Sequence, residues 1–385
     1  MTVETVTLGC RLNFAETETM ARLAPRSEDW VIVNSCAVTN EAVRQTRQAI
    51  RRAHRRRPDA RILVTGCAAE LDRNAFERMP EVNRVVGNAG KLRAFGGMTS
   101  VAAGTHSRVR SFVAVQTGCD HRCTFCSLWQ ARGASRALPF EAIGDAVAGE
   151  IDRGAKEIVL TGVDITDYEG GLGYLCQRLL VAEPRLKRLR LSSLDSVEID
   201  EPLFELIAGE KRLMPHFHLS LQAGDDLILK RMKRRHSRAQ AVAAVERIKA
   251  VRPEATIGAD LIAGFPTETE EMATNSLRLL DDCDIVAAHI FPFSARPNTP
   301  AARMPLVPVE TIKARAARLR EVAQARRTAW LDSLVGSLQP VLIESRSRGH
   351  SDSFAPVAVA GAKRGEVGEV RITGRDGDTL QGVFQ

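Results

Sequence analysis

Three cysteines, Cys119, Cys123 and Cys126, lie within eight residues of one another, directly after a segment that we expect to form a strand. In such a tight loop their sulfur atoms can face a single point. Thiolates are soft ligands that suit iron–sulfur clusters and zinc. Three ligands leave one iron of a [4Fe-4S] cluster open to bind and reduce another molecule, so we favour a cluster here. The alternative is a zinc site that His121 or a distant cysteine would complete.

A second set of cysteines, Cys10, Cys36 and Cys67, is spread along the first part of the chain, and each member directly follows a predicted strand. Parallel strands align their carboxyl ends along one edge of a sheet, where α/β proteins place their ligands. The three thiols can therefore converge on a second cluster. The alternative is that they are buried separately, as free cysteines often are. We expect that reading for Cys176 and Cys283, which lie alone on apolar stretches.

The elements that must position these cysteines alternate between strand and helix. Residues 1–95 predict an α/β domain with a parallel sheet. A linker rich in Gly, Ser and Thr is expected at 94–110, and residues 110–305 then contain six βα units, which fit a partial (β/α)6 barrel. Residues 306–336 predict a basic connecting helix, and residues 337–385 predict a small β-barrel. The barrel strands are expected near 112–115, 157–160, 188–191, 216–219, 256–262 and 285–290, and those of the small barrel near 340–344, 355–359, 367–373 and 379–383.

The first cysteine set, with the aromatic Phe125 before its last member, resembles the motif of the radical S-adenosylmethionine (SAM) superfamily. The segments around it resemble the methylthiotransferase family within that superfamily, and the resemblance covers nearly the whole chain. The other segments that carry it are 7–18 (TLGCRLNFAETE), 34–39 (NSCAVT), 64–68 (VTGCA) and 264–270 (GFPTETE).

The resemblance implies an enzyme with two [4Fe-4S] clusters. The cluster on Cys119, Cys123 and Cys126 would chelate SAM and cleave it reductively to a 5′-deoxyadenosyl radical. The cluster on Cys10, Cys36 and Cys67 would carry an extra sulfur, which a separate SAM molecule methylates before transfer to the substrate carbon. An electron donor such as flavodoxin or ferredoxin is implied as a partner, and the identity of the sulfur donor stays open.

The resemblance also implies that SAM contacts come from the ends of the barrel strands. Residues expected there are Phe125, Gly162, Ser220, Gln222, Asp260 and Gly264. Each of the last five residues, taken alone, has a structural role as often as it contacts a cofactor. The chain departs from the family pattern after Cys126, where Ser127-Leu128-Trp129 stands in place of an Ile-Pro-Tyr-like stretch, and Trp129 can replace the tyrosine by stacking.

The substrate is expected to be tRNA. The segment 9–17 (GCRLNFAET) resembles most the branch that acts on N6-threonylcarbamoyladenosine beside the anticodon, giving 2-methylthio-N6-threonylcarbamoyladenosine, and residues 289–300 point the same way less strongly. The alternatives are methylthiolation of isopentenyladenosine in tRNA or of a ribosomal protein. A protein of a different class, a cluster-bearing RNA-binding or electron-transfer protein without enzymatic activity, would not need an open iron on each cluster.

The charge distribution favours a nucleic-acid partner. The chain has a formal net charge of +7, and residues 41–61 carry eight arginines against Glu41 and Asp59. In a helix, Arg44, Arg47, Arg51 and Arg55 share one face that can contact phosphates; the alternative is a solvated basic face. Residues 339–385 resemble the TRAM module, a small RNA-binding β-barrel, but their six basic and six acidic side chains balance.

The location expected from the sequence is the cytoplasm. The first residues lack the basic and apolar regions of a signal peptide, and no apolar run approaches the ~18 residues that span a bilayer. No membrane partner is therefore expected. In a reducing compartment, spaced cysteines more often bind metal than form disulfides.

Overall fold

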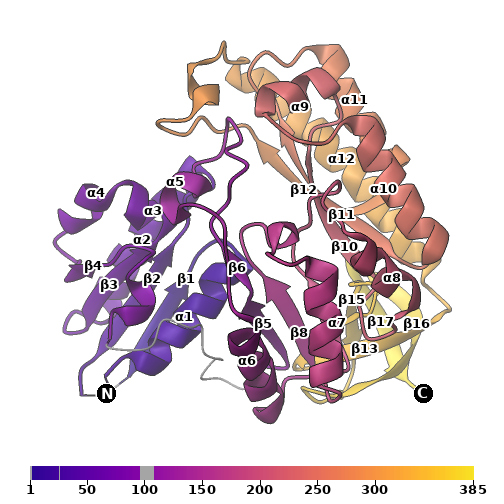
Figure 1. The fold of residues 1–385 in the computed structure, drawn as a ribbon, viewed down its shortest axis with the longest axis horizontal. Coiled ribbons are helices and arrows are strands. Elements are labelled where there is room, and N and C mark those ends of the chain that lie inside the picture. Colours follow the sequence, from indigo (N-terminus) through magenta and orange to yellow (C-terminus); the bar gives the residue numbers. More distant parts are fainter. Residues whose placement is uncertain (1, 26, 96–107) are drawn as a thin grey trace.

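The computed structural model describes residues 2–25, 27–95 and 108–385 (Figure 1). The chain forms an N-terminal α/β domain, a central partial barrel and a small closed C-terminal β-barrel, joined in that order. The fold class expected from the sequence is therefore confirmed. Most of the expected linker, residues 96–107, lies outside the described residues; just before it, Phe95 packs edge-on against Trp30 with ring centres 5.2 Å apart.

The N-terminal domain is a parallel sheet in the order β1-β2-β3-β4. Its strands are buried on both faces, because Val31 and Val33 pack on one side while Ile32 packs on the other. That explains the continuous apolar run of β2, which is typical of parallel sheets covered by helices. The elements are β1 (Val3–Thr7), α1 (Arg11–Leu23), β2 (Trp30–Ser35), α2 (Asn40–Arg56), β3 (Arg61–Gly66), α3 (Cys67–Leu71), α4 (Arg73–Glu77), β4 (Arg84–Val85) and η1 (Lys91–Arg93).

The partial barrel consists of two parallel three-stranded sheets, β5-β8-β9 and β10-β11-β12. Two isolated parallel bridges, Leu189 to Leu213 and Leu194 to Leu219, connect them. All six strands lie where the sequence predicts them: β5 (Arg110–Ala114), β8 (Glu157–Thr161), β9 (Leu189–Leu191), β10 (His216–Gln222), β11 (Thr256–Ala263) and β12 (Ile285–Pro292). The covering helices are α6 (Phe140–Asp152), α7 (Leu172–Ala182), α8 (Glu201–Gly209), α10 (Arg238–Val251) and α11 (Glu270–Asp282).

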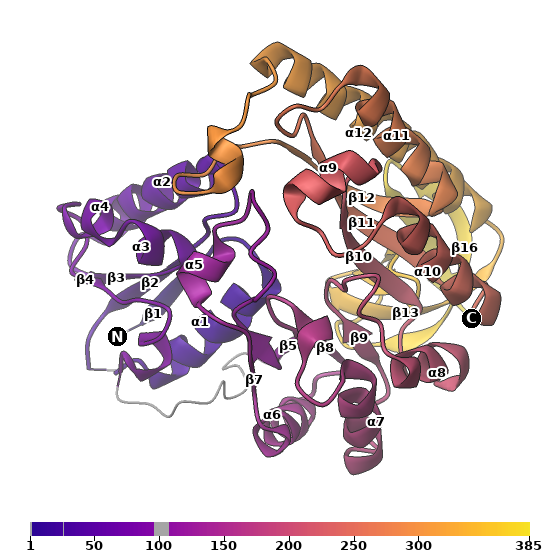
Figure 2. The ribbon, with the colours of Figure 1, turned by 45° about the horizontal axis from the view of Figure 1, so that its top comes forward.

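Successive side chains of these strands point alternately to the apolar core beneath the helices and to the interior of the barrel. Ile158 and Leu160 of β8 join the apolar core beneath the helices, and so do Phe217 and Leu219 of β10. Residues between them, such as His218, point to the other face, because successive side chains of a strand alternate. Helix α1 lies beside β5 (Figures 1 and 2). Phe14 of α1 and Phe112 of β5 have ring centres 6.3 Å apart, so the N-terminal domain covers the first strand of the barrel.

Short elements frame the loop of the first cysteine set. The antiparallel strands β6 (Gln116–Thr117) and β7 (Arg136–Ala137) lie on either side of it, and α5 (Leu128–Arg132) follows the last cysteine. Near the same end of the barrel lie η2 (Ile165–Asp167), α9 (Asp226–Met232) and η3 (Pro300–Arg303).

A single long helix, α12 (Val309–Ser333), connects the two barrels, as the sequence predicts. Ala316 and Leu319 of this helix join the core of the partial barrel. Arg315 is buried and donates to the Glu268 carboxylate at 2.9 Å, which ties the helix to the turn after β11.

The C-terminal barrel is closed, in the order β13-β14-β15-β17-β16. The four strands expected from the sequence are present, and the structure adds β14. The strands are β13 (Leu338–Ser345), β14 (Arg348–Ser351), β15 (Pro356–Val359), β16 (Val367–Asp376) and β17 (Thr379–Phe384). The turn after β14 docks on the amino ends of the partial-barrel strands, where Thr256 Oγ1 donates to the Ser353 carbonyl at 2.8 Å and Arg188 pairs with Asp352.

Candidate active site

The first cysteine set forms a compact loop at the carboxyl ends of the barrel strands. Burial raises the pKa of the Cys126 thiol to about 12, and the neighbouring Cys123 thiol acts in the same direction. The pKa of Cys119 is also raised to about 12, first by burial, with Asp164, Cys126 and Cys123 adding to the effect. Each thiol therefore lies close enough to the others to feel their charge. Three convergent thiols of this kind fit a cluster better than three unrelated cysteines.

Backbone hydrogen bonds hold this loop against the barrel. Thr124 donates its N–H to the Met232 carbonyl at 3.0 Å, and its hydroxyl donates to the Arg231 carbonyl at 2.8 Å. In turn, the Ala301 N–H donates to the Thr124 carbonyl at 3.0 Å. Segments far apart in the chain, α9 and η3, thus fix the path of the loop from both sides.

The second set also converges. Cys36 and Cys67 are buried, whereas Cys10 is exposed. Burial raises the pKa of the Cys36 thiol to about 11, and the thiols of Cys67 and Cys10 act in the same direction. Gly9 has a left-handed φ of +92°, and a Cβ there would stand 2.7 Å from the Cys36 sulfur. Glycine at this position therefore allows the β1–α1 turn to approach Cys36 closely.

The two sets lie next to each other: Arg132, six residues after Cys126, donates from its Nε to the Cys67 sulfur at 3.3 Å, and the charge of Cys67 adds to the raised pKa of Cys126. Packing explains the proximity: Ala131 of α5 shares an apolar core with Cys67 and Ala68 of α3, and Figure 2 shows α5 between the N-terminal domain and the barrel. The six cysteines therefore surround one region between the two domains.

Arg132 joins the domains at this point. It is buried at the end of α5, and its Nε donates to the Cys67 sulfur at 3.3 Å. Its terminal nitrogens donate to the Glu16 carboxylate at 2.9 and 3.0 Å and to Asn13 Oδ1 at 2.7 Å. Lys91, also buried, pairs with the same carboxylate. Burial alone would raise the pKa of Glu16, but Arg132 and Lys91 hold it at about 2.

These residues are not among the sequence-based predictions. Arg132 lies six residues after Cys126, close to the first cysteine set. Its partners Glu16 and Lys91 are far away in the chain, and no pattern of neighbouring residues predicts that they contact it. An arginine at the end of a short helix that directly follows a cysteine motif is the feature that could have indicated it.

Comparison with known proteins fits this arrangement. Residues 113–280 match the family model described as the radical SAM superfamily, and residues 2–87 match the one described as uncharacterized protein family UPF0004. The chain is 42% identical over 380 residues to the threonylcarbamoyladenosine tRNA methylthiotransferase of Rickettsia prowazekii, covering 92% of this chain and 90% of the relative. The chain belongs to the radical SAM methylthiotransferase family.

Two other relatives show the breadth of this methylthiotransferase family. The protein of the same name from Aquifex aeolicus is 33% identical and covers 96% of this chain and 99% of its own length. The tRNA-2-methylthio-N(6)-dimethylallyladenosine synthase of Cereibacter sphaeroides is 31% identical, covering 98% and 97%. Among solved structures, the radical SAM methyltransferase TsrM of Kitasatospora setae matches with a TM-score of 0.56 at 16% identity, covering 75% of this chain and 69% of that one. That likeness supports the fold.

Five of the six predicted SAM-contacting residues of this methylthiotransferase lie at or near the carboxyl end of the barrel, and the sixth, Asp260, lies in the middle of β11. Phe125 packs edge-on against Phe265, with ring centres 6.5 Å apart. Gly162 directly follows β8, and the Ser220 carbonyl accepts a hydrogen bond from Arg234 at 2.8 Å. Gln222 ends β10 in a left-handed conformation with φ of +69°.

Gly264 and Asp260 have structural surroundings of their own. Gly264 has φ of +72°, and a Cβ there would stand 2.5 Å from the Ile312 side chain of α12, so packing of that helix already requires glycine. One oxygen of Asp260 accepts hydrogen bonds from His218 at 2.9 Å and from His289 at 3.0 Å. Burial alone would raise the pKa of Asp260, but these two hydrogen bonds lower it.

His121, which the sequence offers as a possible zinc ligand, faces carboxylates. Its Nε2 lies 2.8 Å from Asp164 Oδ2 and 3.1 Å from Glu198 Oε1. The contacts with Asp164 and then Glu198 raise the pKa of His121 to about 10. Close by, Arg234, whose side chain is 7% exposed, donates to the Cys123 sulfur at 3.5 Å. No local pattern indicates this cationic residue, because it is more than a hundred positions from the cysteine that it contacts.

The arginines of α2 are exposed but mostly paired. Arg44 makes two hydrogen bonds of 2.7 Å to Glu41. Arg47 lies 3.6 Å from an Asp72 oxygen, and Arg51 lies 3.9 Å from a Glu81 oxygen. The start of α2 is near the barrel, where Asn40 Nδ2 donates to the Ala295 carbonyl at 3.2 Å (Figure 2). The positive charge of this face is therefore partly compensated within the domain.

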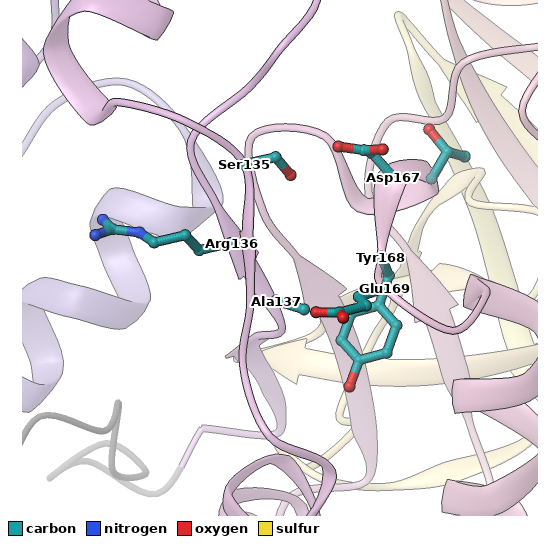
Figure 3. A pocket seen from close by; sticks show the side chains of 7 residues that line it. Ser135, Arg136, Ala137, Asp167, Tyr168 and Glu169 are labelled. Carbon is teal, nitrogen blue, oxygen red and sulfur yellow. The ribbon is translucent and has the colours of Figure 1, made fainter.

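An open pocket lies between the β7 segment and η2 (Figure 3). Its wall includes Asp167 and Glu169, and Figure 3 shows that the Arg136 side chain extends away from these two carboxylates. A pocket of this charge is poorly suited to RNA phosphates. Among the described residues, none of the helices has the length and apolar character needed to cross a membrane.

Proposed function

We propose that this enzyme transfers a methylthio group to C2 of N6-threonylcarbamoyladenosine beside the anticodon of tRNA, giving 2-methylthio-N6-threonylcarbamoyladenosine. The observation that carries the proposal is the juxtaposition of two separate sets of three cysteines, joined where Arg132 of α5 donates to the Cys67 sulfur at 3.3 Å, in a chain 42% identical to a methylthiotransferase with that named substrate. Methylthiolation needs a radical source and a sulfur source close together, and this arrangement supports both.

The thiols fit two [4Fe-4S] clusters, since each set offers three convergent sulfur atoms. Cys119, Cys123 and Cys126 would hold one, and Cys10, Cys36 and Cys67 the other. When bound, the first supplies the electron that cleaves SAM to the 5′-deoxyadenosyl radical, and the second supplies the sulfur that is methylated and transferred. The electron must come from an external donor, for which a flavodoxin or ferredoxin is suitable.

The protein's own contribution is to fix charge and position around these thiols. The guanidinium groups of Arg132 and Arg234 donate to the sulfurs of Cys67 and Cys123, one in each set. Such charge-assisted contacts stabilise thiolates over thiols. We propose that Phe125, Gly162, Ser220, Gln222, Asp260 and Gly264 line the SAM site at the adjoining strand ends.

RNA binding is proposed for two surfaces. On α2, phosphates would be contacted by Arg55 and by three arginines whose charge is partly compensated by acidic partners, Arg44, Arg47 and Arg51. The C-terminal barrel would help to place the anticodon loop. A single-stranded loop suits such an enzyme, because its base can enter a pocket without opening a duplex.

The test is anaerobic reconstitution followed by a nucleoside assay. The wild-type protein should bind about eight irons and convert threonylcarbamoyladenosine in tRNA to its 2-methylthio form, seen by mass spectrometry. The Cys119→Ala, Cys123→Ala, Cys126→Ala variant should keep about four irons and lose SAM cleavage. The matched variant of Cys10, Cys36 and Cys67 should lose transfer but keep part of the cleavage. Product only on dimethylallyladenosine, or 5′-deoxyadenosine from the first variant, would contradict the proposal.

A further inference from the structure

Arg11 directly follows Cys10 and is the first residue of α1. Its guanidinium carbon lies 6.0 Å from the centre of the Phe354 ring, which the C-terminal barrel contributes. The guanidinium carbons of Arg110 and Arg190 lie 4.9 and 4.7 Å from the centre of the same ring. The side chain therefore reaches into the partial barrel from the N-terminal domain and lies among other cations.

Those other cations have acidic partners. Arg190 donates to Glu157 at 2.9 Å, Arg188 lies 3.1 Å from the same carboxylate, and Arg110 also pairs with it. Within residues 2–25, 27–95 and 108–385, no carboxylate lies within ion-pair distance of Arg11. A guanidinium that is half-buried among cations and has no paired anion is unfavourable unless a ligand supplies one.

The part of the barrel interior around Asp260 is accessible and polar. Asp260, one of the charges near Arg11, lies in the middle of β11, and its carboxylate is already engaged by His218 and His289. The His289 side chain is 64% exposed, so this part of the barrel interior is open to an incoming molecule. Asp260 therefore gives polar contacts in the same space without neutralising Arg11 directly.

We propose that Arg11 binds the carboxylate on the N6 substituent of the substrate base and so selects a carboxylate-bearing nucleoside over an uncharged one. This inference rests on the proposed function. A threonylcarbamoyl group carries a carboxylate, whereas a dimethylallyl group carries none. Arg11 follows Cys10 in the chain, and its side chain extends from there toward Phe354 at the amino ends of the barrel strands. A base that reacts beside Cys10 can therefore reach this guanidinium with an exocyclic substituent that points into the barrel interior. The planar guanidinium can bind a carboxylate through two parallel hydrogen bonds.

The experiment compares two anticodon stem-loop RNAs that differ only in charge. One carries threonylcarbamoyladenosine, and the other carries the same group with its carboxylate converted to a carboxamide. Affinities are measured by filter binding with the full-length, cluster-reconstituted protein in the absence of SAM, because the carboxylate of SAM is the other source of the same ligand chemistry. The proteins are the wild type, Arg11→Gln, Arg11→Lys and, as a control of equal charge change, Arg278→Gln on the exposed face of α11.

The wild type and the control should prefer the carboxylate RNA by about 10- to 100-fold, which is the range for a hydrogen-bonded ion pair. Arg11→Gln should bind the two RNAs equally, and Arg11→Lys should keep part of the preference. Equal preference in wild type and Arg11→Gln, or loss only of SAM binding in a parallel titration, would overturn the inference. Turnover by the wild-type enzyme tests the proposed function separately. If the wild type forms product on threonylcarbamoyladenosine RNA but Arg11→Gln keeps the wild-type binding preference, only the inference about Arg11 is contradicted.

Discussion

At the scale of single residues, the site depends on buried charges that sit between domains. Arg132 contacts Cys67, Glu16 and Asn13, and so connects α5 of the barrel side with α1 and α3 of the N-terminal domain. Buried ion pairs of this kind add little net stability, but removal of one partner leaves a buried charge uncompensated. We therefore expect Arg132 to matter for the relative placement of the two cysteine sets.

Replacing Arg132 by Met should destabilise the cluster-free, reduced protein by about 2–3 kcal/mol, because Glu16 then keeps only Lys91 as a partner. The double variant with Glu16→Gln should lose less stability than the sum of the single variants. Urea unfolding followed by tryptophan fluorescence measures both. As a control, Arg185→Met removes an exposed arginine that pairs with Glu183 and should change stability little. Additive losses would show that Arg132 and Glu16 are not coupled.

The pKa of Glu16 gives a pH dependence with a definite sign. Its ordinary value is 4.5 and its value in the folded protein is about 2. The folded state therefore favours the ionised carboxylate, and the resulting stability is present above pH 4.5 and lost as the pH falls toward 2. The wild-type protein without clusters should lose more stability over this range than Glu16→Gln. Identical pH profiles of urea midpoints for the two proteins would contradict the assignment.

At the scale of elements, helix α2 shows why the number of arginines overstates the positive charge that is available to bind RNA. Arg44 and Arg47 have acidic partners within the domain, and so does Arg51. RNA phosphates would have to displace these partners, which reduces the gain from each contact. Arg55 is exposed and lies further along the same face.

Changing Arg47, Arg51 and Arg55 to Ala should weaken tRNA binding and lower the salt slope by about two units, because released counterions scale with phosphate contacts. Filter binding across a salt series gives the slope. Changing Arg185, Arg212 and Arg247, which lie in the partial barrel and pair with acids, alters the charge equally and should leave the slope unchanged. An equal slope in wild type and the α2 variant would mean that this face is only solvated.

At the scale of the whole molecule, the two ends of the partial barrel have different roles. The cysteine loop lies at the carboxyl ends of the strands, whereas the C-terminal barrel docks at the amino ends (Figure 1). Phe354 stands at this junction: its ring stacks on His216 with centres 5.2 Å apart, and Arg190 lies 4.7 Å from the ring centre.

Phe354→Ala should loosen this junction, because it removes the stacked and cation–π contacts together. Hydrogen exchange should rise in β13–β15 and in the amino ends of β10 and β11, while the iron content stays at the wild-type value. Val383→Ala, an exposed change in the same small barrel, should leave exchange at the junction unaltered. Loss of iron together with altered exchange would indicate that docking and cluster binding are not separate.

The sequence by itself determined those features that depend on neighbouring residues. The cysteine spacing at 119–126, the six barrel strands and the helix near 309–334 follow local patterns of residue type, and the structure has these elements where they were expected. The convergence of the second cysteine set could also be predicted, because parallel strands place their carboxyl ends at one edge of the sheet. Strand β14 was missed because Arg348–Ser351 has no alternation of apolar residues and forms by pairing with its neighbours.

Only the tertiary structure decided which charges are paired. Arg132 and Arg234 contact cysteines 65 and 111 positions away, and Arg47 and Arg51 of α2 meet acids from outside their helix. Arg11 lies beside Arg110 and Arg190 and has no ion-pair partner among the residues that the structure describes. No local pattern encodes such pairs, because they depend on the way in which separate domains pack. The same packing places the C-terminal barrel at the amino ends of the strands, opposite the cysteine loop.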